Sequence, residues 1–153
     1  MTYTVKVLKE GYSKFENGVY KANGTSTLIL GPKFKVVVDT LSAWDRELLL
    51  SALAEQGVSP GDITHVVNTH GHPDHVGNNN LFTGDNVIHV MGHAIHTNDT
   101  YFTDVSFQAG EIFNIDENKL QVTIHKLLTT VVRRTLRLSL VQVTLSIVSS
   151  SRW

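Results

Sequence analysis

Four side chains of the metal-ligand type lie within six residues, in a segment that reads THGHPDHVG. They are His70, His72, Asp74 and His75, and they form the pattern H-x-H-x-D-H. Imidazole nitrogen and carboxylate oxygen suit a borderline divalent ion such as zinc. We expect His70 and His72 to bind one ion, and Asp74 and His75 to turn toward a second. Two ions roughly 3.5–4 Å apart can share and activate a water molecule.

The elements around this segment explain how the four side chains could be positioned. An apolar run over 63–68 predicts a short strand that ends just before His70, and Gly71 and Pro73 shape the turn that follows. Another apolar run over 34–38 predicts a second strand, which ends at Asp39. A strand–helix–strand unit of this kind favours a layered α/β fold.

The helix of that unit is expected over 41–56. Ser42 with Asp45 resembles a capping box at its start, and Gly57 suits its carboxyl-terminal cap. Further strands are expected over 2–8, 26–30, 86–91, 111–115 and 119–125, and a loop or hairpin over 11–24.

Composition changes at residue 126. From there to residue 153 the chain has no Gly, Pro, Asp, Glu, Asn or His. A domain rarely runs so far without a turn signal. We therefore divide the chain into a partial domain over 1–125 and an atypical tail over 126–153.

The bulk composition is that of an ordinary globular protein. The chain has 153 residues and a formal net charge of −1, which argues against a large basic platform for nucleic acid. It has no Cys, so thiolate ligands are excluded. No apolar run is long enough for a transmembrane helix, and the amino terminus does not read as a signal peptide. We expect a cytoplasmic or nuclear protein without a membrane partner.

The segment THGHPDHVGN resembles the signature of the metallo-β-lactamase superfamily. The upstream order also resembles that family: a strand ending in Asp39, a helix, a turn reading SPGDI and then the motif strand. The run VGNNNLFTGDNVIHVMGHAIH is similar to one branch of it. The likeness covers about residues 3 to 125. It implies an αβ/βα sandwich, with the amino-terminal half present and the carboxyl-terminal half missing or altered.

The resemblance also implies roles for the motif residues. His70 and His72 would bind the first zinc, Asp74 and His75 the second, and Asp74 would also orient the attacking hydroxide. The similar branch is described as zinc-dependent endoribonucleases acting on histone pre-mRNA 3′ ends, which implies RNA as a partner, and its relatives are thought to form homodimers. Other relatives hydrolyse β-lactams, or small thioesters such as S-lactoylglutathione, as glyoxalase II does. Fold alone does not choose among these substrates.

The downstream ligands of the family are not visible. Past Asp116 the chain has no Asp, and its only His is His125. Without the bridging carboxylate two ions would repel each other with less compensation, so the second ion is less well held here. Residues 127–133, LLTTVVR, correspond to a family-like Thr-Pro-Tyr-His stretch read one base out of frame, on codons chosen to fit. We therefore hold two hypotheses for the tail: a shift in coding frame, and a genuine β-rich terminus.

Several other residues are candidates of lower specificity. His93 and His96 could be ligands on a helix, but we expect loop residues. His125 could replace the third His, although its context does not match the family turn. Asp39 could support a ligand from behind, or could be a plain turn residue. His65 is expected to be structural, and His89 to face a sheet surface. A basic cluster, Arg133, Arg134 and Arg137, lies in the tail and says nothing about RNA if the frame has shifted.

Two functions of different classes stay open. The first is a metal-dependent hydrolase, in which zinc lowers the pKa of water from about 16 toward roughly 7 so that hydroxide is available to attack. The second is a non-catalytic chain: a truncated product, or a metal-binding module without turnover. The absent downstream ligands favour the second function for the isolated polypeptide.

Overall fold

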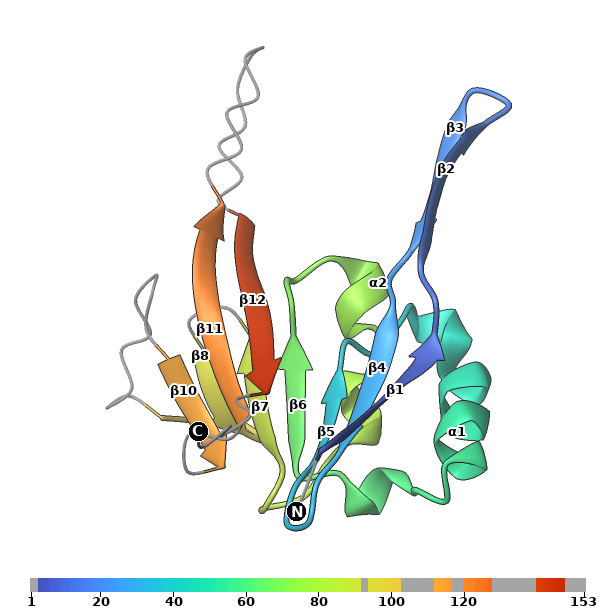
Figure 1. Ribbon diagram of the computed structural model, residues 1–153. Helices are drawn as coiled ribbons and strands as arrows, with labels where there is room; N and C mark the ends of the chain where they lie inside the picture. The colour runs from blue at the N-terminus through green and yellow to red at the C-terminus, as the bar shows by residue number, and fades with distance from the viewer. Residues whose placement is uncertain (1–2, 92–93, 103–111, 117–119, 128–139, 148–153) are drawn as a thin grey trace, which may run out of the picture.

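The computed structural model describes residues 3–91, 94–102, 112–116, 120–127 and 140–147. Its largest element is a seven-stranded sheet in the order β1-β4-β5-β6-β7-β8-β9 (Figure 1). The strands are β1 (Thr4–Lys9), β4 (Ser26–Leu30), β5 (Lys35–Val38), β6 (His65–Asn68), β7 (Ile88–Met91), β8 (Ala94–Thr97) and β9 (Thr100–Tyr101). The central strands β5, β6 and β7 are parallel, and the other pairs are antiparallel.

Alternation along the central strands produces two cores, one on each face of the sheet. Successive residues point to opposite faces, so Val66 and Val67 belong to different cores. On one face α1 (Arg46–Glu55) buries Leu49 and Leu53. The other face packs against Ile115 and Leu120. These two residues come from a three-stranded sheet of β10 (Ile112–Asp116), β11 (Leu120–Leu127) and β12 (Leu140–Ile147). The layers are therefore helix, sheet and sheet.

A hairpin of β2 (Tyr12–Glu16) and β3 (Val19–Asn23) projects from the body beyond β1 and β4 (Figure 1). Asn17 and Gly18 form its turn with φ of 51° and 78°, the left-handed pair that a tight two-residue hairpin requires. The sequence predicted a loop or hairpin over 11–24, and the hairpin is the outcome.

The start of the predicted helix is wrong. Leu41 has a φ of 59° and is not helical, a short 3₁₀ turn follows at η1 (Ala43–Asp45), and α1 begins at Arg46. Ser42 makes no capping bond, because its hydroxyl donates instead to the amide oxygen of Asn23 at 3.4 Å. A capping box does form at Ser59 and Asp62, around η2 (Pro60–Asp62), in the turn that leads to β6.

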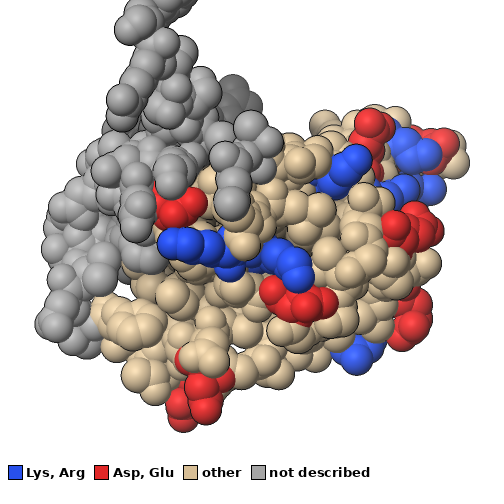
Figure 2. Space-filling model, turned by 60° about the horizontal axis from the view of Figure 1, so that its bottom comes forward, with Lys and Arg blue, Asp and Glu red and all other residues tan. Residues whose placement is uncertain are grey.

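Gly57 ends α1 as expected, with a φ of 69°. Two short elements follow β6: α2 (Pro73–Val76) and η3 (Asn79–Leu81). In the part of the chain that the structure describes, no helix is both long and apolar enough to cross a membrane. The face in Figure 2 carries basic and acidic side chains interspersed among wide neutral areas, in agreement with the near-zero net charge.

Candidate metal centre

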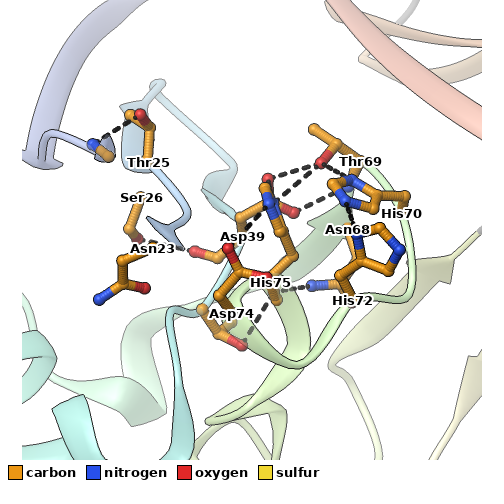
Figure 3. Close-up of polar contacts among 12 residues, drawn as sticks. Asn23, Thr25, Ser26, Asp39, Asn68, Thr69, His70, His72, Asp74 and His75 are labelled. Carbon is orange, nitrogen blue, oxygen red and sulfur yellow. Dashed lines mark hydrogen bonds and ion pairs between the residues drawn. The ribbon is translucent and has the colours of Figure 1, made fainter. Parts of the chain in front are cut away.

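The four motif residues lie together at the carboxyl end of β6. Thr69 and His70 follow the strand directly, and His72 precedes α2, which carries Asp74 and His75. Because β5 and β6 are parallel, Asp39 arrives at the same edge from β5. Figure 3 shows Asp39 and the rings of His70 and His75 gathered around the hydroxyl of Thr69.

The four side chains form two pairs. His70 Nε2 lies 2.9 Å from His72 Nδ1, and His75 Nε2 lies 3.6 Å from an Asp74 carboxylate oxygen. The rings of His70 and His75 join the pairs, with 3.9 Å between their centroids. Tetrahedral zinc with bonds of about 2.0–2.1 Å keeps ligand atoms roughly 3.3 Å apart, close to both separations.

As they stand, His70 and His72 are hydrogen-bonded to each other, and the four side chains are not open to a common point. No group of three or more His, Asp or Glu side chains among the described residues is placed to hold a single ion. The donor set nevertheless fits zinc in chemistry, because each pair offers two nitrogen or oxygen donors near ligand spacing. Small side-chain rotations would separate His70 from His72.

Asp39, at the carboxyl end of β5, anchors this centre. Its carboxylate accepts the Thr69 backbone N–H at 2.8 Å, the Thr69 hydroxyl at 2.7 Å and His75 Nδ1–H at 2.7 Å. Its side chain is 4% exposed, and its φ is 58°. A left-handed backbone is tolerated by Asp better than by most residues, and the bonds compensate for its cost. Because Asp39 holds Nδ1, the Nε2 atom of His75 is left beside Asp74.

The pKa values of the two partly buried histidines move in opposite directions. Burial acts to lower the pKa of His75, but the hydrogen bond and charge of Asp39, with the charge of Asp74, outweigh it and raise that pKa. Burial and the charges of His75 and His72 lower the pKa of His70. The environment therefore favours protonated His75 and neutral His70 when no cation is present.

Two glycines let neighbouring segments approach the centre closely. A Cβ on Gly24, at the base of the hairpin, would lie 2.5 Å from the Asp74 carbonyl oxygen. A Cβ on Gly77 would lie 2.3 Å from the backbone nitrogen of Ala43. Real side chains do not approach so closely, so α2 can sit where it does only because both positions are Gly.

The other sequence candidates lie elsewhere. His96 is in β8 rather than in a loop, because it pairs across the sheet with His89, and their rings stack with centroids 5.1 Å apart. His65 is buried in β6, and burial lowers its pKa to about 4, which fits a structural role. The side chain of His125 and the residues His93, Arg133, Arg134 and Arg137 lie outside the described part of the chain.

Sequence reasoning missed Thr69 and Thr40, which both bond to parts of the centre. Thr40 donates its backbone N–H to the His75 carbonyl oxygen at 2.8 Å. Thr69 directly follows β6, and Thr40 follows Asp39 just beyond β5, and those positions were the available signal. Asn79 was also missed, since an Asn run reads as a loop, and so was Asn68, the last residue of an apolar strand.

A model of the metallo-β-lactamase superfamily matches residues 19–134. The chain belongs to this superfamily. The superfamily comprises hydrolases whose members generally bind metal ions, often zinc, and the α/β architecture described above agrees with its fold, as the sequence predicted. The division of the chain at residue 126 stays a prediction.

Similar proteins carry the same family name. Metallo-β-lactamase domain-containing protein 1 of Xenopus laevis is 55% identical over 82 residues, which cover 53% of this chain and 35% of that protein. The human protein of that name is 41% identical over 110 residues, covering 54% of this chain and 41% of that protein. The matches thus span well under half the length of these curated relatives.

Solved structures agree on the fold. A subclass B3 metallo-β-lactamase of Bradyrhizobium japonicum superposes with a TM-score of 0.52 at 18% identity, covering 67% of this chain and 45% of that one. Another B3 enzyme, with an active-site glutamic acid, gives a TM-score of 0.55 at 19% identity and covers 84% and 53%. At such identities the likeness establishes the fold and not the substrate.

Proposed function

We propose that this chain carries the amino-terminal half of a zinc-dependent hydrolase site whose substrate class is RNA. The observation that carries the proposal is the pairing of His70 with His72 beside that of Asp74 with His75, with Asp39 directing the ring of His75. Zinc is favoured because the donors are nitrogen and oxygen atoms of His and Asp. RNA is favoured by the resemblance to the branch described as histone pre-mRNA endoribonucleases.

Each residue has a part in this proposal. His70 and His72 would hold one zinc, and Asp74 and His75 the other. When bound, zinc supplies a water whose pKa falls from about 16 to roughly 7, so that hydroxide forms near neutral pH. Asp74, whose side chain is 23% exposed, would accept a hydrogen bond from the attacking water and so orient it. Asp39, which is buried, would hold His75 in one ring orientation.

A second candidate is a chain that binds metal without turnover. The observation that favours it is that no three His, Asp or Glu side chains in the described residues are placed around one ion. An ion held by only two protein ligands keeps more water and binds more weakly than one held by three or four.

The test is to measure zinc per chain by mass spectrometry, beside hydrolysis of bis(p-nitrophenyl) phosphate, a single-stranded RNA oligonucleotide and S-lactoylglutathione. His72→Ala is the site variant, and His96→Ala is the matched control on β8. Stoichiometric zinc with RNA cleavage that His72→Ala abolishes would support the proposal. Zinc without turnover supports the second candidate, turnover of the thioester alone rejects RNA, and zinc at background rejects both candidates.

A further inference from the structure

Asn68 is a polar residue at the end of an otherwise apolar strand, and it is fully buried. Burying an amide costs free energy unless it is hydrogen-bonded. Asn68 Nδ2 donates to the His75 carbonyl oxygen at 2.8 Å and to Asn79 Oδ1 at 3.2 Å, and Asn68 Oδ1 accepts from Asn79 Nδ2 at 2.8 Å. The amide therefore makes three bonds, and one of them goes to the main chain of a motif residue.

The direction of these bonds agrees with the donors and acceptors of the neighbouring groups. The N–H of Asn78, which can only donate, gives a bond to Thr40 Oγ1 at 3.2 Å. The Thr40 hydroxyl then donates to Asn79 Oδ1 at 2.8 Å. Asn79 is thereby turned so that its Nδ2 donates to Asn68 Oδ1, and Asn68 is turned so that its Nδ2 donates to His75. The His75 carbonyl oxygen can only accept, so the Asn68 atom beside it is Nδ2, and the orientations of the two amides agree.

The helix at the end of this chain of hydrogen bonds, α2, is not stable by itself. Helix α2 has only four residues, too few to be stable alone. The His75 carbonyl oxygen accepts from the Thr40 backbone N–H at 2.8 Å and from Asn68 Nδ2 at 2.8 Å. The ring of the same residue is held by Asp39. His75 is thus fixed at both its main chain and its side chain.

Asn78 provides a contrast. Its side chain donates to the carbonyl oxygens of Thr40 and Ser42, at 2.8 and 2.7 Å, and so ties the loop before η1. Neither of these side-chain bonds reaches a motif residue. A buried Asn in this region can therefore be structural only, and Asn68 differs from Asn78 by touching His75.

We propose that Asn68 is a positioning residue for metal binding by Asp74 and His75, and that Asn79 holds the Asn68 amide in the orientation that donates to His75. The inference rests on the proposed function, since it needs those two residues to be ligands. Residues that orient metal ligands typically change metal affinity by about 10- to 100-fold when replaced.

The test uses Asn68→Asp, which keeps the shape of the side chain but replaces its donor with an acceptor. The matched control is Asn80→Asp, which adds the same negative charge at an exposed position next to Asn79. Co²⁺ affinity of the full chain is measured by titration of its visible absorption, and the thermal midpoint is measured without metal. We expect Asn68→Asp to weaken Co²⁺ binding by about tenfold or more. A nearby negative charge would by itself attract the cation, so the loss runs against simple Coulomb attraction.

Two further variants separate positioning from general damage. Asn79→Asp keeps the oxygen that Thr40 and Asn68 donate to but loses its own donor, so we expect a smaller loss than for Asn68→Asp. In a His75→Ala background the carbonyl that Asn68 contacts remains, but the ring that it positions is gone. Asn68→Asp should therefore cause a smaller further loss of Co²⁺ affinity than in the unaltered protein, whereas a general packing defect would cause the same loss in both.

The outcomes are distinct. If Asn68→Asp binds Co²⁺ as tightly as Asn80→Asp, the positioning role is wrong, even if the unaltered protein binds zinc and cleaves RNA. If Asn68→Asp does not fold, Asn79→Asp decides: equal affinity to Asn80→Asp overturns the inference, and a several-fold loss supports it. If the unaltered protein binds no metal, the proposed function itself fails.

Discussion

The two pairs of motif residues are held by different means, although they lie only a few residues apart. The side-chain hydrogen bonds of His70 and His72 reach only each other and the adjacent Thr69. His75 is held by Asp39, 36 residues earlier, and by Thr40 and Asn68. The fold therefore pre-organises the Asp74–His75 pair, while the His70–His72 pair depends on local geometry and on whatever it binds.

The largest expected effect on stability comes from replacing Asp39, which anchors His75. Asp39→Ala would leave the Thr69 donors and His75 Nδ1 without their buried partner and place Ala at a left-handed φ. We expect a loss of about 3–5 kcal/mol in the free energy of unfolding, measured by urea denaturation without metal. His72→Ala should change it by less than about 0.5 kcal/mol, because His72 is exposed. If both variants lost the same free energy of unfolding, the two pairs would not be held by different means.

Replacing two glycines, Gly77 and Gly71, tests the same contrast with an effect on stability of intermediate size. Gly77→Ala would force a Cβ into the backbone of Leu41, Ser42 and Ala43, and it should destabilise the protein by about 1–3 kcal/mol or prevent folding. Gly71→Ala, between His70 and His72, meets nothing within 4 Å and should be nearly neutral. Thermal unfolding of both variants measures the difference, and a neutral Gly77→Ala would contradict the tight packing of α2.

The smallest expected effect concerns the pKa values of His75 and His70 and their contribution to stability. In the metal-free protein, NMR titration should place the pKa of His75 above its ordinary value and that of His70 below it. His75 thus stabilises the folded state below its unfolded pKa, about 6.5, and this contribution is lost as pH rises through the folded pKa. His70 contributes in the opposite sense, above about 6.5, and its contribution is lost as pH falls. Asp39→Asn should remove the raised pKa of His75, and an unchanged pKa of His75 in that variant would refute this cause.

Much of the fold was predictable because its signals are local. The apolar runs of β4 and β6, the turn at Gly57 and the strand–helix–strand order were all read from adjacent residues. The start of α1 was not, because Ser42 bonds to Asn23 on the hairpin. His96 was misplaced because its strand is defined by pairing with β7 and β9.

The same limit applies to the candidate centre. The spacing of His70, His72, Asp74 and His75 marked the segment, and the family resemblance suggested a role for Asp39. The amide chain through Asn68 and Asn79 was invisible, because its members are joined by Thr40, which lies 39 residues before Asn79. A polar residue at the end of an apolar strand was the one available hint.

The parallel pairing of β5 with β6 has a consequence for the order of folding. Asp39 and Thr69 meet only after the crossover through α1 has closed, which is a non-local step and therefore slow to form. His70 and His72 are separated by a single residue, so an unfolded or nascent chain already presents them together. A cation that binds this pair before folding would stabilise the native state less than its native affinity suggests. Metal added during refolding should therefore stabilise the native protein chiefly through the Asp74–His75 pair.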